Sequence, residues 1–406
     1  MEFNSMNLEI DKSEWKEVKL GDVAFEYSKR INEPGKSGFD RFVGNSNIEK
    51  WDLNIKSWES SASVTSAMKF FDVGDYLLVR RSLYASDFRE RAPRADFSGV
   101  CSGDILTIKE NPEFIYDGYL AAVLNSKSLW KFVVANASGS ITRRIKWKDL
   151  ENFTFLLPPK SLQKKLSLLI WSLEELSTNK RTVLRSLFNL RSSFFSEKTN
   201  CEVNREFGQS SWVRKKIKDL AKVVRGSSPR PAGSPLYFDG DYLPWITVAA
   251  LTNKSTPEIK IEDVPSYLTE IGATKTRILP ANTVLLSNSG YSLGVPAILP
   301  FEAGANDGVA AFLNLKGLSR EYLYYFLDSK TKYFRESIAA GADQPNLNTS
   351  RIGNIEIAVP DMETQQSIVS DMKQIDCAIL DIKKSLKAEK SLLLSILSKV
   401  DLKEQG

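Results

Sequence analysis

The sequence of 406 residues contains no histidine, and this absence excludes several kinds of active site. Ser-His and Cys-His catalytic pairs, His-ligated zinc and acid–base chemistry by imidazole all depend on that residue. Cysteine is nearly as scarce. Cys101, Cys201 and Cys377 lie too far apart for a CxxC metal or redox motif, so we expect free thiols in a reducing cytosol.

Long apolar segments and a large excess of one charge are also missing. No run approaches the roughly 18 apolar residues of a membrane span, and the first residues lack the core of a signal peptide, so we expect a cytoplasmic protein without membrane contact. The 55 Lys and Arg against 50 Asp and Glu leave a net charge of only +5. With 42% hydrophobic residues the chain has a folded protein's composition, and its length predicts at least two domains.

The sequence does contain an internal repeat. Residues 139–158 (GSITRRIKWKDLENFTFLLP) correspond to residues 341–360 (GADQPNLNTSRIGNIEIAVP), with matching glycine, asparagine and proline and an alternating apolar strand before the proline. Residues 13–24 and 210–221 also match, each with an early tryptophan and a late aspartate. We therefore predict two similar halves that join near residues 198–209.

Each repeated segment is followed by a predicted long helix. Its apolar residues are spaced alternately four and three apart, which is the heptad pattern of a coiled coil. The residues expected at the helix–helix interface are Leu166, Leu169, Leu173, Leu176, Val183, Leu187 and Leu190 of the first helix and Ile375, Ile379, Ile382, Leu386, Leu393 and Ile396 of the second.

A twofold relation between the halves would make the helices antiparallel, and two registers are then possible. One sets Leu176 opposite Leu386. The other, one heptad away, sets Lys180 opposite Glu389 and pairs the two polar breaks in the heptads. The alternative is that each helix packs only on its own domain.

Outside the long helices, basic residues are concentrated in the segments 80–94, 139–148 and 212–230. Lysine and arginine at this density can neutralise phosphates, and arginine can read guanine through two N–H donors. A solvated surface would also explain any single segment, but three together favour a polyanion such as DNA.

Polar loops add amides and hydroxyls to these segments. The loops are RGSSPRP at 225–231, SNSGYS at 287–292 and DQPNLN at 343–348, and such residues contact bases or phosphates but also form turns. The candidate DNA-binding residues are Arg80, Arg81, Tyr84, Arg89, Arg91, Arg94, Ser140, Thr142, Arg143, Arg144, Lys146, Arg225, Ser227, Ser228, Arg230, Asn288, Ser289, Tyr291, Gln344, Asn346 and Asn348.

Catalytic motifs are absent, so we expect neither a catalytic nor a metal site. Gly35-Lys36-Ser37 resembles the end of a P-loop, but Arg30 occupies the place of its first glycine. Leu157-Pro158-Pro159-Lys160 lacks the polar and aromatic ends of an adenine methyltransferase tetrapeptide. Glu14-Trp15-Lys16 fits a nuclease-like E-x-K triplet, which is frequent by chance.

This layout resembles the specificity (S) subunit of type I restriction–modification systems over nearly the whole chain. The most specific pieces are GSSPRP followed by GDYLPWITVAALT at 240–252, ILPANTVLLSNSGYSLG at 278–294, and QPNLN leading through IEIAVP to a glutamine-bearing helix start. The first half is more diverged, since PPKSLQKKL at 158–166 keeps Gln163 but lacks the usual acidic residue before it.

The resemblance implies an α+β fold with a pseudo-twofold internal repeat, in which two mixed α/β target-recognition domains are separated by two long helices forming an antiparallel coiled coil. The domains would span residues 1–158 and 210–360, with conserved spacer helices at 159–198 and 361–406 and a linker at 199–209. It also implies a non-catalytic chain that reads a bipartite double-stranded DNA target, one domain per half-site, with the helices as a ruler for the gap.

The resemblance further implies partners and their cofactors. Two methyltransferase (M) subunits would flip and methylate an adenine of each half-site with S-adenosylmethionine, and two restriction (R) subunits would use ATP and Mg for cleavage in host defence. The chain itself would bind no cofactor and act in the prokaryotic cytoplasm, at the nucleoid. The alternatives are a coiled-coil adaptor that binds protein or RNA, and an enzyme whose motifs have diverged.

Overall fold

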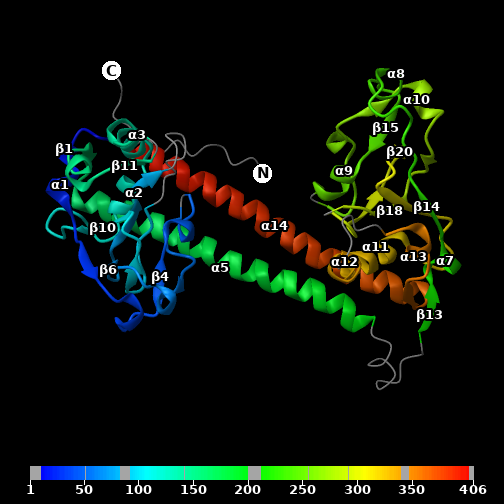
Figure 1. Cartoon of the computed structure of the whole chain (residues 1–406), viewed down its shortest axis with the longest axis horizontal. Helices are drawn as coiled ribbons and strands as arrows, with labels where there is room; N and C mark the ends of the chain where they lie inside the picture. The colour runs from blue at the N-terminus through cyan, green and yellow to red at the C-terminus, as the bar shows by residue number, and fades with distance from the viewer. Residues whose placement is uncertain are drawn as a thin grey trace. The chain divides into compact units, whose positions relative to one another are not determined.

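The computed structural model describes residues 11–50, 52–82, 92–140, 142–199, 212–254, 256–290, 292–339 and 347–401 (Figure 1). The chain divides into two compact units. Unit 1 comprises residues 1–182 and 383–406, and unit 2 comprises residues 183–382. Two long helices, α5 (Lys160–Lys198) and α14 (Met362–Asp401), each contribute residues to both units.

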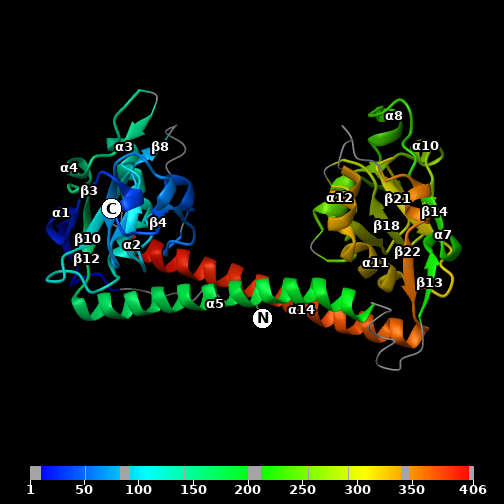
Figure 2. The same cartoon turned by 60° about the horizontal axis from the view of Figure 1, so that its bottom comes forward.

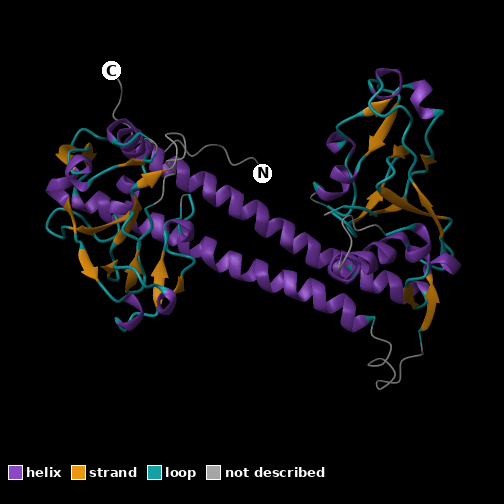
Figure 3. Ribbon diagram, viewed as in Figure 1, coloured by secondary structure: helices purple, strands orange, loops and turns teal. Residues whose placement is uncertain are grey.

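Apart from its parts of the two long helices, unit 1 is built mainly from short strands (Figure 3). The strands are β1 (Lys16–Lys19), β2 (Ala24–Glu26), β3 (Lys29–Ile31), β4 (Arg41–Val43), β5 (Glu59–Ser60), β6 (Met68–Phe71), β7 (Tyr76–Val79), β8 (Arg81–Ser82), β9 (Gly99–Cys101), β10 (Ile105–Glu110), β11 (Arg143–Arg144) and β12 (Thr154–Leu157). The short helices are α1 (Leu20–Val23), α2 (Leu120–Leu124), α3 (Lys127–Asn136) and α4 (Trp147–Leu150). One sheet has the order β2–β10–β7, a second has the order β3–β6–β9–β4–β5, and β1–β12 and β8–β11 are separate pairs.

Unit 2 has the same kind of construction. Its strands are β13 (Val213–Lys216), β14 (Lys222–Arg225), β15 (Leu243–Ile246), β16 (Tyr267–Leu268), β17 (Ile278–Leu279), β18 (Thr283–Ser287), β19 (Pro296–Leu299), β20 (Ala303–Ala305), β21 (Val309–Leu313) and β22 (Glu356–Val359). Its short helices are α7 (Ile217–Leu220), α8 (Pro235–Phe238), α9 (Val248–Thr252), α10 (Glu270–Ala273), α11 (Arg320–Ser329), α12 (Thr331–Ala339) and α13 (Thr349–Gly353). The sheet orders are β14–β21–β18–β19 and β16–β15–β20–β17, with β13–β22 as a separate pair.

The inner strands β10, β18 and β21 and the edge strand β7 form the most buried part of the two units. β7 and β18 are buried throughout, and β10 and β21 along most of their length, as expected for strands covered on both faces. One helix after the sheets of each unit, α3 in unit 1 and α11 in unit 2, begins at a serine. Ser126 accepts a hydrogen bond from the backbone N–H of Leu129 in α3, and Ser319 accepts one from Tyr322 in α11. These caps satisfy backbone donors that a helix start leaves free.

A buried glutamine marks the repeat in both units. At the start of α5, Gln163 Oε1 accepts from Tyr116 N at 2.8 Å, and Nε2 donates to the carbonyl oxygens of Phe114 and Pro158. At the start of α14, Gln365 bonds in the same way, as an acceptor from Ser319 N at 2.8 Å and a donor to the carbonyl oxygens of Gly317 and Pro360. The two glutamines are separated by the same number of residues as Gly139 and Gly341, so the internal repeat is confirmed.

Each long helix begins in one unit and ends in the other. α5 begins in unit 1 and ends in unit 2, and α14 begins in unit 2 and ends in unit 1. The end of α14 enters the core of unit 1 through Leu393, Ile396, Leu397 and Val400. The end of α5 enters the core of unit 2 through Phe195. The alternative that each helix packs only on its own domain is therefore wrong.

The two helices contact each other in both units (Figures 1 and 2). In unit 1, Lys180 of α5 forms an ion pair with Glu389 of α14, and Ser177 Oγ donates to Glu389 Oε2 at 2.8 Å. In unit 2, Arg191 Nε of α5 lies 2.5 Å from Asp376 Oδ1 of α14. Residues further along α5 meet earlier residues of α14, so the helices are antiparallel, in the register that sets Lys180 opposite Glu389. The predicted α+β fold is confirmed.

Most residues predicted at the helix interface are buried or half-buried. These are Leu166, Leu173, Leu187, Ile375, Ile379, Ile382, Leu386, Leu393 and Ile396. Four residues of α5 are exposed and correct the prediction: Leu169 (39%), Leu176 (44%), Val183 (48%) and Leu190 (46%). The side chains one position further along are buried or half-buried in their place: Ile170, Ser177, Leu184 and Arg191. Polar contacts explain this shift of one position, because Ser177 and Arg191 face α14, where they bond Glu389 and Asp376.

Candidate nucleic-acid interface

In unit 1, the pairing of β8 with β11 brings two of the basic segments together. Arg144 lies opposite Arg81, and Arg143 lies opposite Ser82. Two segments that are distant in the chain thus form one arginine-rich pair of strands beyond the end of β7. The predicted residues Arg80, Arg81, Arg143 and Arg144 belong to this cluster.

Asp104, which directly precedes β10, holds this arginine cluster. Arg81 Nη1 lies 2.7 Å from Asp104 Oδ2, and Arg144 Nη2 lies 3.0 Å from Asp104 Oδ1. Arg80 Nη2 donates to the backbone carbonyl of Gly103 at 2.9 Å. Because an arginine has five N–H donors, Arg81 and Arg144 use only part of their capacity on this acid.

The other predicted residues around β11 are exposed or half-buried. Arg143 donates to the carbonyl oxygen of Ala137 at 3.2 Å from Nε and 2.7 Å from Nη2, which fixes the turn. Ser140 and Lys146 are exposed, and Thr142 is half-buried. Both exposed side chains can therefore approach a phosphate without rearrangement of the fold.

In unit 2, the corresponding acid is Asp307, just before β21. Its carbonyl oxygen accepts from Arg225 Nε, and its carboxylate lies 3.3 Å from Arg230 Nη2. Ser228 and Asp307 also exchange backbone-to-side-chain hydrogen bonds of 3.3 Å. Ser227 lies between these residues and donates its backbone N–H to Ala305 O at 2.9 Å. The RGSSPRP loop is thus bound to the loop before β21.

Glycine is required at the start of that loop. A Cβ atom at Gly226 would lie 2.2 Å from the carbonyl oxygen of Asn306 and 2.4 Å from that of Ala305. Backbone overlap of this kind cannot be relieved by a side-chain movement. Gly226 therefore allows the loop to approach the segment that contains Asp307.

Asn288 follows β18 and is almost fully buried, with 1% of its surface exposed. Its backbone N–H donates to Gly308 O and its carbonyl oxygen accepts from Leu347 N at 2.8 Å. Within the described part of the chain, the side-chain oxygens of Asn288 and Asn306 are buried without a hydrogen-bond partner. Ser289 is half-buried beside them. Asn288, a predicted DNA-binding residue, is thus buried at the end of β18 and is not a surface residue.

Two predicted residues lie away from these clusters and have structural roles. Arg94 is ion-paired with Asp117, and its guanidinium lies 5.8 Å from the ring of Trp171 on α5, so it joins the sheet region to the helix. Asn348 caps α13, with Oδ1 accepting from Arg351 N at 2.9 Å. The predicted residues that lie outside the described ranges are Tyr84, Arg89, Arg91, Tyr291, Gln344 and Asn346.

Charge counting along the sequence missed Asp104, Asp307 and Asn306. Net charge treats an acid within a basic segment as a simple subtraction, whereas here the acids organise the arginines. The signal that was available is an aspartate just before the buried central strand in each half, in SGDILTI and in ANDGVAAF.

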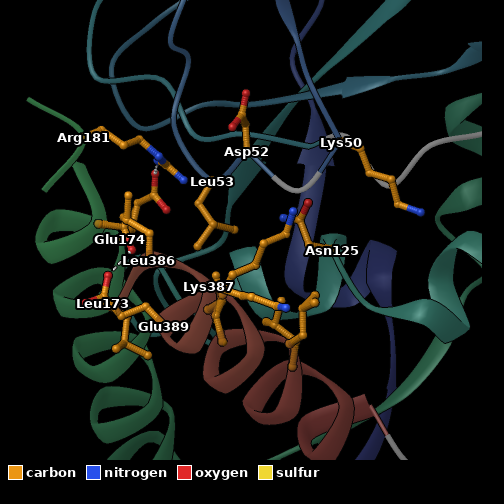
Figure 4. Close-up of a pocket in the computed structure, with 15 residues that line it drawn as sticks. Lys50, Asp52, Leu53, Asn125, Leu173, Glu174, Arg181, Leu386, Lys387 and Glu389 are labelled. Carbon is orange, nitrogen blue, oxygen red and sulfur yellow. Dashed lines mark hydrogen bonds and ion pairs between the residues drawn. The ribbon is translucent and has the colours of Figure 1, made fainter. Parts of the chain in front are cut away.

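A pocket of about 320 Å³ lies in unit 1, where the sheet region contacts both long helices (Figure 4). Several of the charged residues that line it form ion pairs. Glu174 Oε1 lies 3.2 Å from Lys56 Nζ and 3.7 Å from Arg181 Nη1, and Lys56 Nζ lies 2.5 Å from Asp52 Oδ1. The pocket is best explained as part of the joint that holds the helices on unit 1.

Among the described residues, no group of three or more cysteine, aspartate or glutamate side chains is arranged to hold a metal ion. In the same ranges, no helix combines the length and the apolar character that crossing a bilayer requires.

Comparison with known proteins is consistent with this arrangement. Residues 209–389 match the family described as "Type I restriction modification DNA specificity domain". The chain is 34% identical over 176 residues to the specificity subunit of the type I restriction enzyme MjaIX from Methanocaldococcus jannaschii. That match covers 43% of this chain and 40% of the relative, so the chain spans less than half the length of the relative that it matches.

Solved structures resemble nearly the whole chain. One, from a study of complex assembly and conformational transition of the type I R-M system, covers 96% of this chain and 97% of its own, with 19% identity and a TM-score of 0.60. The match to the S subunit of the type I restriction–modification system of M. genitalium covers 98% of this chain and 99% of that subunit, with 14% identity and a TM-score of 0.59. These similarities establish the fold. The matched domain and the sequence relative add that residues 209–389 are similar to the DNA specificity domain of type I restriction–modification systems, and that part of the chain is similar to a specificity subunit of such a system.

Proposed function

We propose that this chain is a non-catalytic specificity subunit that reads a bipartite double-stranded DNA target, with one recognition domain for each half-site. The observation that supports this best is the repetition of one framework with two different polar clusters. Each unit places arginine side chains around an aspartate that precedes its central strand. One framework with two sets of reading residues suits a target made of two different half-sites.

The chemistry of the two clusters fits DNA. Guanidinium groups such as those of Arg81 and Arg144 can neutralise phosphates or pair with the major-groove edge of guanine. The serine hydroxyls of the RGSSPRP loop match phosphates. We therefore expect the two domains to prefer different base sequences.

The primary experiment is selection of bound duplexes from a random pool with the purified chain. The expected result is two conserved blocks separated by a fixed number of unconserved base pairs, with affinity falling steeply as salt rises. Indifference to duplex DNA would instead support the adaptor hypothesis, in which the coiled coil binds protein or RNA. Replacing Arg143 and Arg144 by alanine should reduce the salt slope, and an unchanged slope would show that neither arginine contacts phosphate.

The long helices are proposed to set the gap between the half-sites. By heptad counting from the Lys180–Glu389 pair, residues 181–187 of α5 and 382–388 of α14 are matching heptads of the two sequences. Deleting both heptads preserves the apolar pattern and shortens the helices by about 10 Å, or about three base pairs. The selected gap should shrink by that amount while both half-sites stay the same. An unchanged gap would contradict the proposal that the long helices set its length.

One face of α5 is proposed to bind the methyltransferase subunits. Leu169 and Leu176 in unit 1 are exposed, and Val183 and Leu190 in unit 2 continue the same seven-residue spacing. An exposed apolar stripe of this kind is suited to pairing with a helix of another chain. The double variant Leu169→Gln and Leu176→Gln should lose M subunits in a pull-down but keep its DNA selection. Leu168→Gln, at a leucine that is also exposed but lies outside this stripe, is the control.

The cofactors are proposed to bind the partners rather than this chain. S-adenosylmethionine would bind the M subunits, and ATP with Mg would bind the R subunits. The pure chain incubated with labelled S-adenosylmethionine and its selected duplex should transfer no methyl group until an M subunit is added. Methyl transfer by the chain alone would favour the diverged-enzyme hypothesis.

A further inference from the structure

In each unit, one aspartate before the central strand contacts two arginines. Asp104 precedes β10, and its carboxylate binds Arg81 and Arg144 from two different segments. Asp307 precedes β21 and contacts two arginines of one loop, Arg225 through its backbone carbonyl oxygen and Arg230 through its carboxylate. β10 and β21 are the corresponding central strands, since β10 lies between β2 and β7 and β21 lies between β14 and β18. Neither aspartate is needed to neutralise a charge in a hydrophobic core.

The contacts in unit 1 leave little freedom to the two guanidinium groups. The two carboxylate oxygens of Asp104 are occupied by different arginines, and the acid is only 17% exposed. Arg81 and Arg144 are also opposite each other in the β8–β11 pair, so each is fixed by its backbone and by the acid. Arg144 remains 47% exposed and therefore accessible.

The contacts in unit 2 fix the acid itself. Asp307 accepts a backbone N–H from Ser228 on one carboxylate oxygen and contacts Arg230 through the other, while its carbonyl oxygen accepts from Arg225. Arg230 is 73% exposed. The acid is thus anchored by the loop whose arginines it binds.

A carboxylate in such a position acts in opposite directions on two kinds of DNA contact. It weakens binding to phosphates, because it cancels part of the positive potential that drives non-specific association. It strengthens reading of bases, because a guanidinium held in one orientation loses less entropy when it pairs with a base edge. The net effect is a larger difference between the correct site and all other DNA.

We propose that Asp104 and Asp307 are positioning residues for sequence discrimination, each holding the arginines of one recognition domain for base contact and opposing their use on phosphates. This proposal rests on the proposed function of DNA recognition. It assigns to the two acids a role that is separate for each half-site.

The test compares Asp104→Asn and Asp307→Asn with the unchanged full chain. Affinity is measured by equilibrium binding to the selected duplex, to duplexes with one half-site scrambled, and to unrelated DNA, across a range of salt. Asp104→Asn should make the salt slope on unrelated DNA steeper by about one. It should reduce discrimination at one half-site by at least about fivefold, the lower end of what one base contact contributes. Asp307→Asn should do the same at the other half-site.

Two further variants separate positioning from structure. Asp117→Asn removes an acid that also binds an arginine, Arg94, but lies away from the cluster, so both half-sites should be read normally. Asp104→Glu keeps the charge but moves it, so the salt slope should stay at the wild-type value while discrimination falls. That variant also decides the matter if Asp104→Asn does not fold.

The outcomes are distinguishable. If the unchanged chain selects no DNA sequence, the proposed function fails. If it selects a bipartite site but Asp104→Asn and Asp307→Asn retain both the discrimination and the salt slope, the function stands and the role of the acids is overturned. An equal loss at both half-sites from either variant would also contradict it.

Discussion

The first turn of α5 in unit 1 and the first turn of α14 in unit 2 are each held by a buried glutamine at the equivalent position. The loops around Asp104 and Asp307, in contrast, are built differently. Gln163 is 1% exposed and Gln365 is 0% exposed, and each makes the same three hydrogen bonds. The antiparallel pairs β1–β12 and β13–β22 also correspond. The junction between sheet and helix is therefore the constant part of the repeat.

The variable part lies at one end of the corresponding sheets. In unit 1 the arginines that reach Asp104 come from beyond β7, while in unit 2 those that reach Asp307 come from the end of β14, on the opposite side of the central strand. Arg80 follows β7 where Asn288 follows β18. A constant junction with variable loops allows the reading residues to change without loss of the fold.

The units also differ in how polar residues fix the helix pair. In unit 1, Lys180 and Glu389 join the two helices to each other. In unit 2, Arg191 bonds both Asp376 of α14 and Asp328 of α11, so it joins both helices to the domain. The network in unit 2 thus joins three helices through two acids, whereas the Lys180–Glu389 pair in unit 1 joins two helices through one acid.

The largest effect is expected from Arg191→Leu. The change leaves two carboxylates without their cation and should cost unit 2 about 3–5 kcal/mol, because a part-buried charge that loses its partner is strongly destabilising. Lys180→Leu leaves only Glu389 and should cost unit 1 less. Hydrogen exchange of backbone amides in each unit measures the two costs separately. Arg185→Leu, at an exposed arginine of α5, is the control; equal costs at positions 191 and 180 would remove the difference between the units.

The sequence predicted the repeat, the long helices and most of their buried residues, because heptad spacing and strand alternation follow directly from packing. The prediction placed Leu169 and Leu176 of α5 at the helix interface, where the structure has Ile170 and Ser177. Both pairs of positions fit the alternating spacing of four and three residues. The choice depends on Ser177 bonding Glu389, a contact with another helix that apolar spacing cannot register.

The candidate site was predicted in part for a similar reason. Clustering of basic residues identified Arg81 and Arg144, and the pairing of β8 with β11 brings them together. The same rule included Arg94, which the fold directs to Asp117 and α5 instead. Whether an arginine faces a ligand or an internal acid depends on partners that are distant in sequence, such as Asp104.

A second prediction tests the constant part of the comparison. Gln163→Ala and Gln365→Ala each leave three backbone groups without a partner at a buried junction, so each should cost its own unit about 2–3 kcal/mol. The two costs should be equal because the hydrogen bonds are the same. Exchange rates of amides at the two junctions provide the measurement. Gln366→Ala, at the exposed neighbour, is the control, and clearly unequal costs would show that the two junctions are not equivalent.

A third prediction concerns pH and the helix pair of unit 1. Burial acts to raise the pKa of Glu389, but hydrogen bonds from Lys180 and Ser177 and the charge of Lys180 outweigh it, so the pKa lies below its ordinary value. The pair therefore contributes its full stability above about pH 5 and loses it as pH falls below about 4. The difference in stability between the wild type and Glu389→Gln should shrink over that window. A difference that is constant with pH would show that the carboxylate charge contributes nothing to the pairing.

The smallest expected effect is a difference in thiol reactivity between the two units, measured without any change in stability. Cys101 lies in β9 of unit 1, where burial raises the pKa of its thiol to about 12, while Cys377 lies exposed on α14 in unit 2. Since the thiolate is the reactive form, Cys377 should react with a thiol reagent at neutral pH and Cys101 should not until unit 1 unfolds. A Cys201→Ser background removes the third thiol, and peptide mass spectrometry locates the label. Because Cys101 reports only on unit 1, its labelling in the presence of denaturant also tests the comparison above: in the Gln163→Ala variant it should begin at lower denaturant, whereas in the Gln365→Ala variant it should not shift.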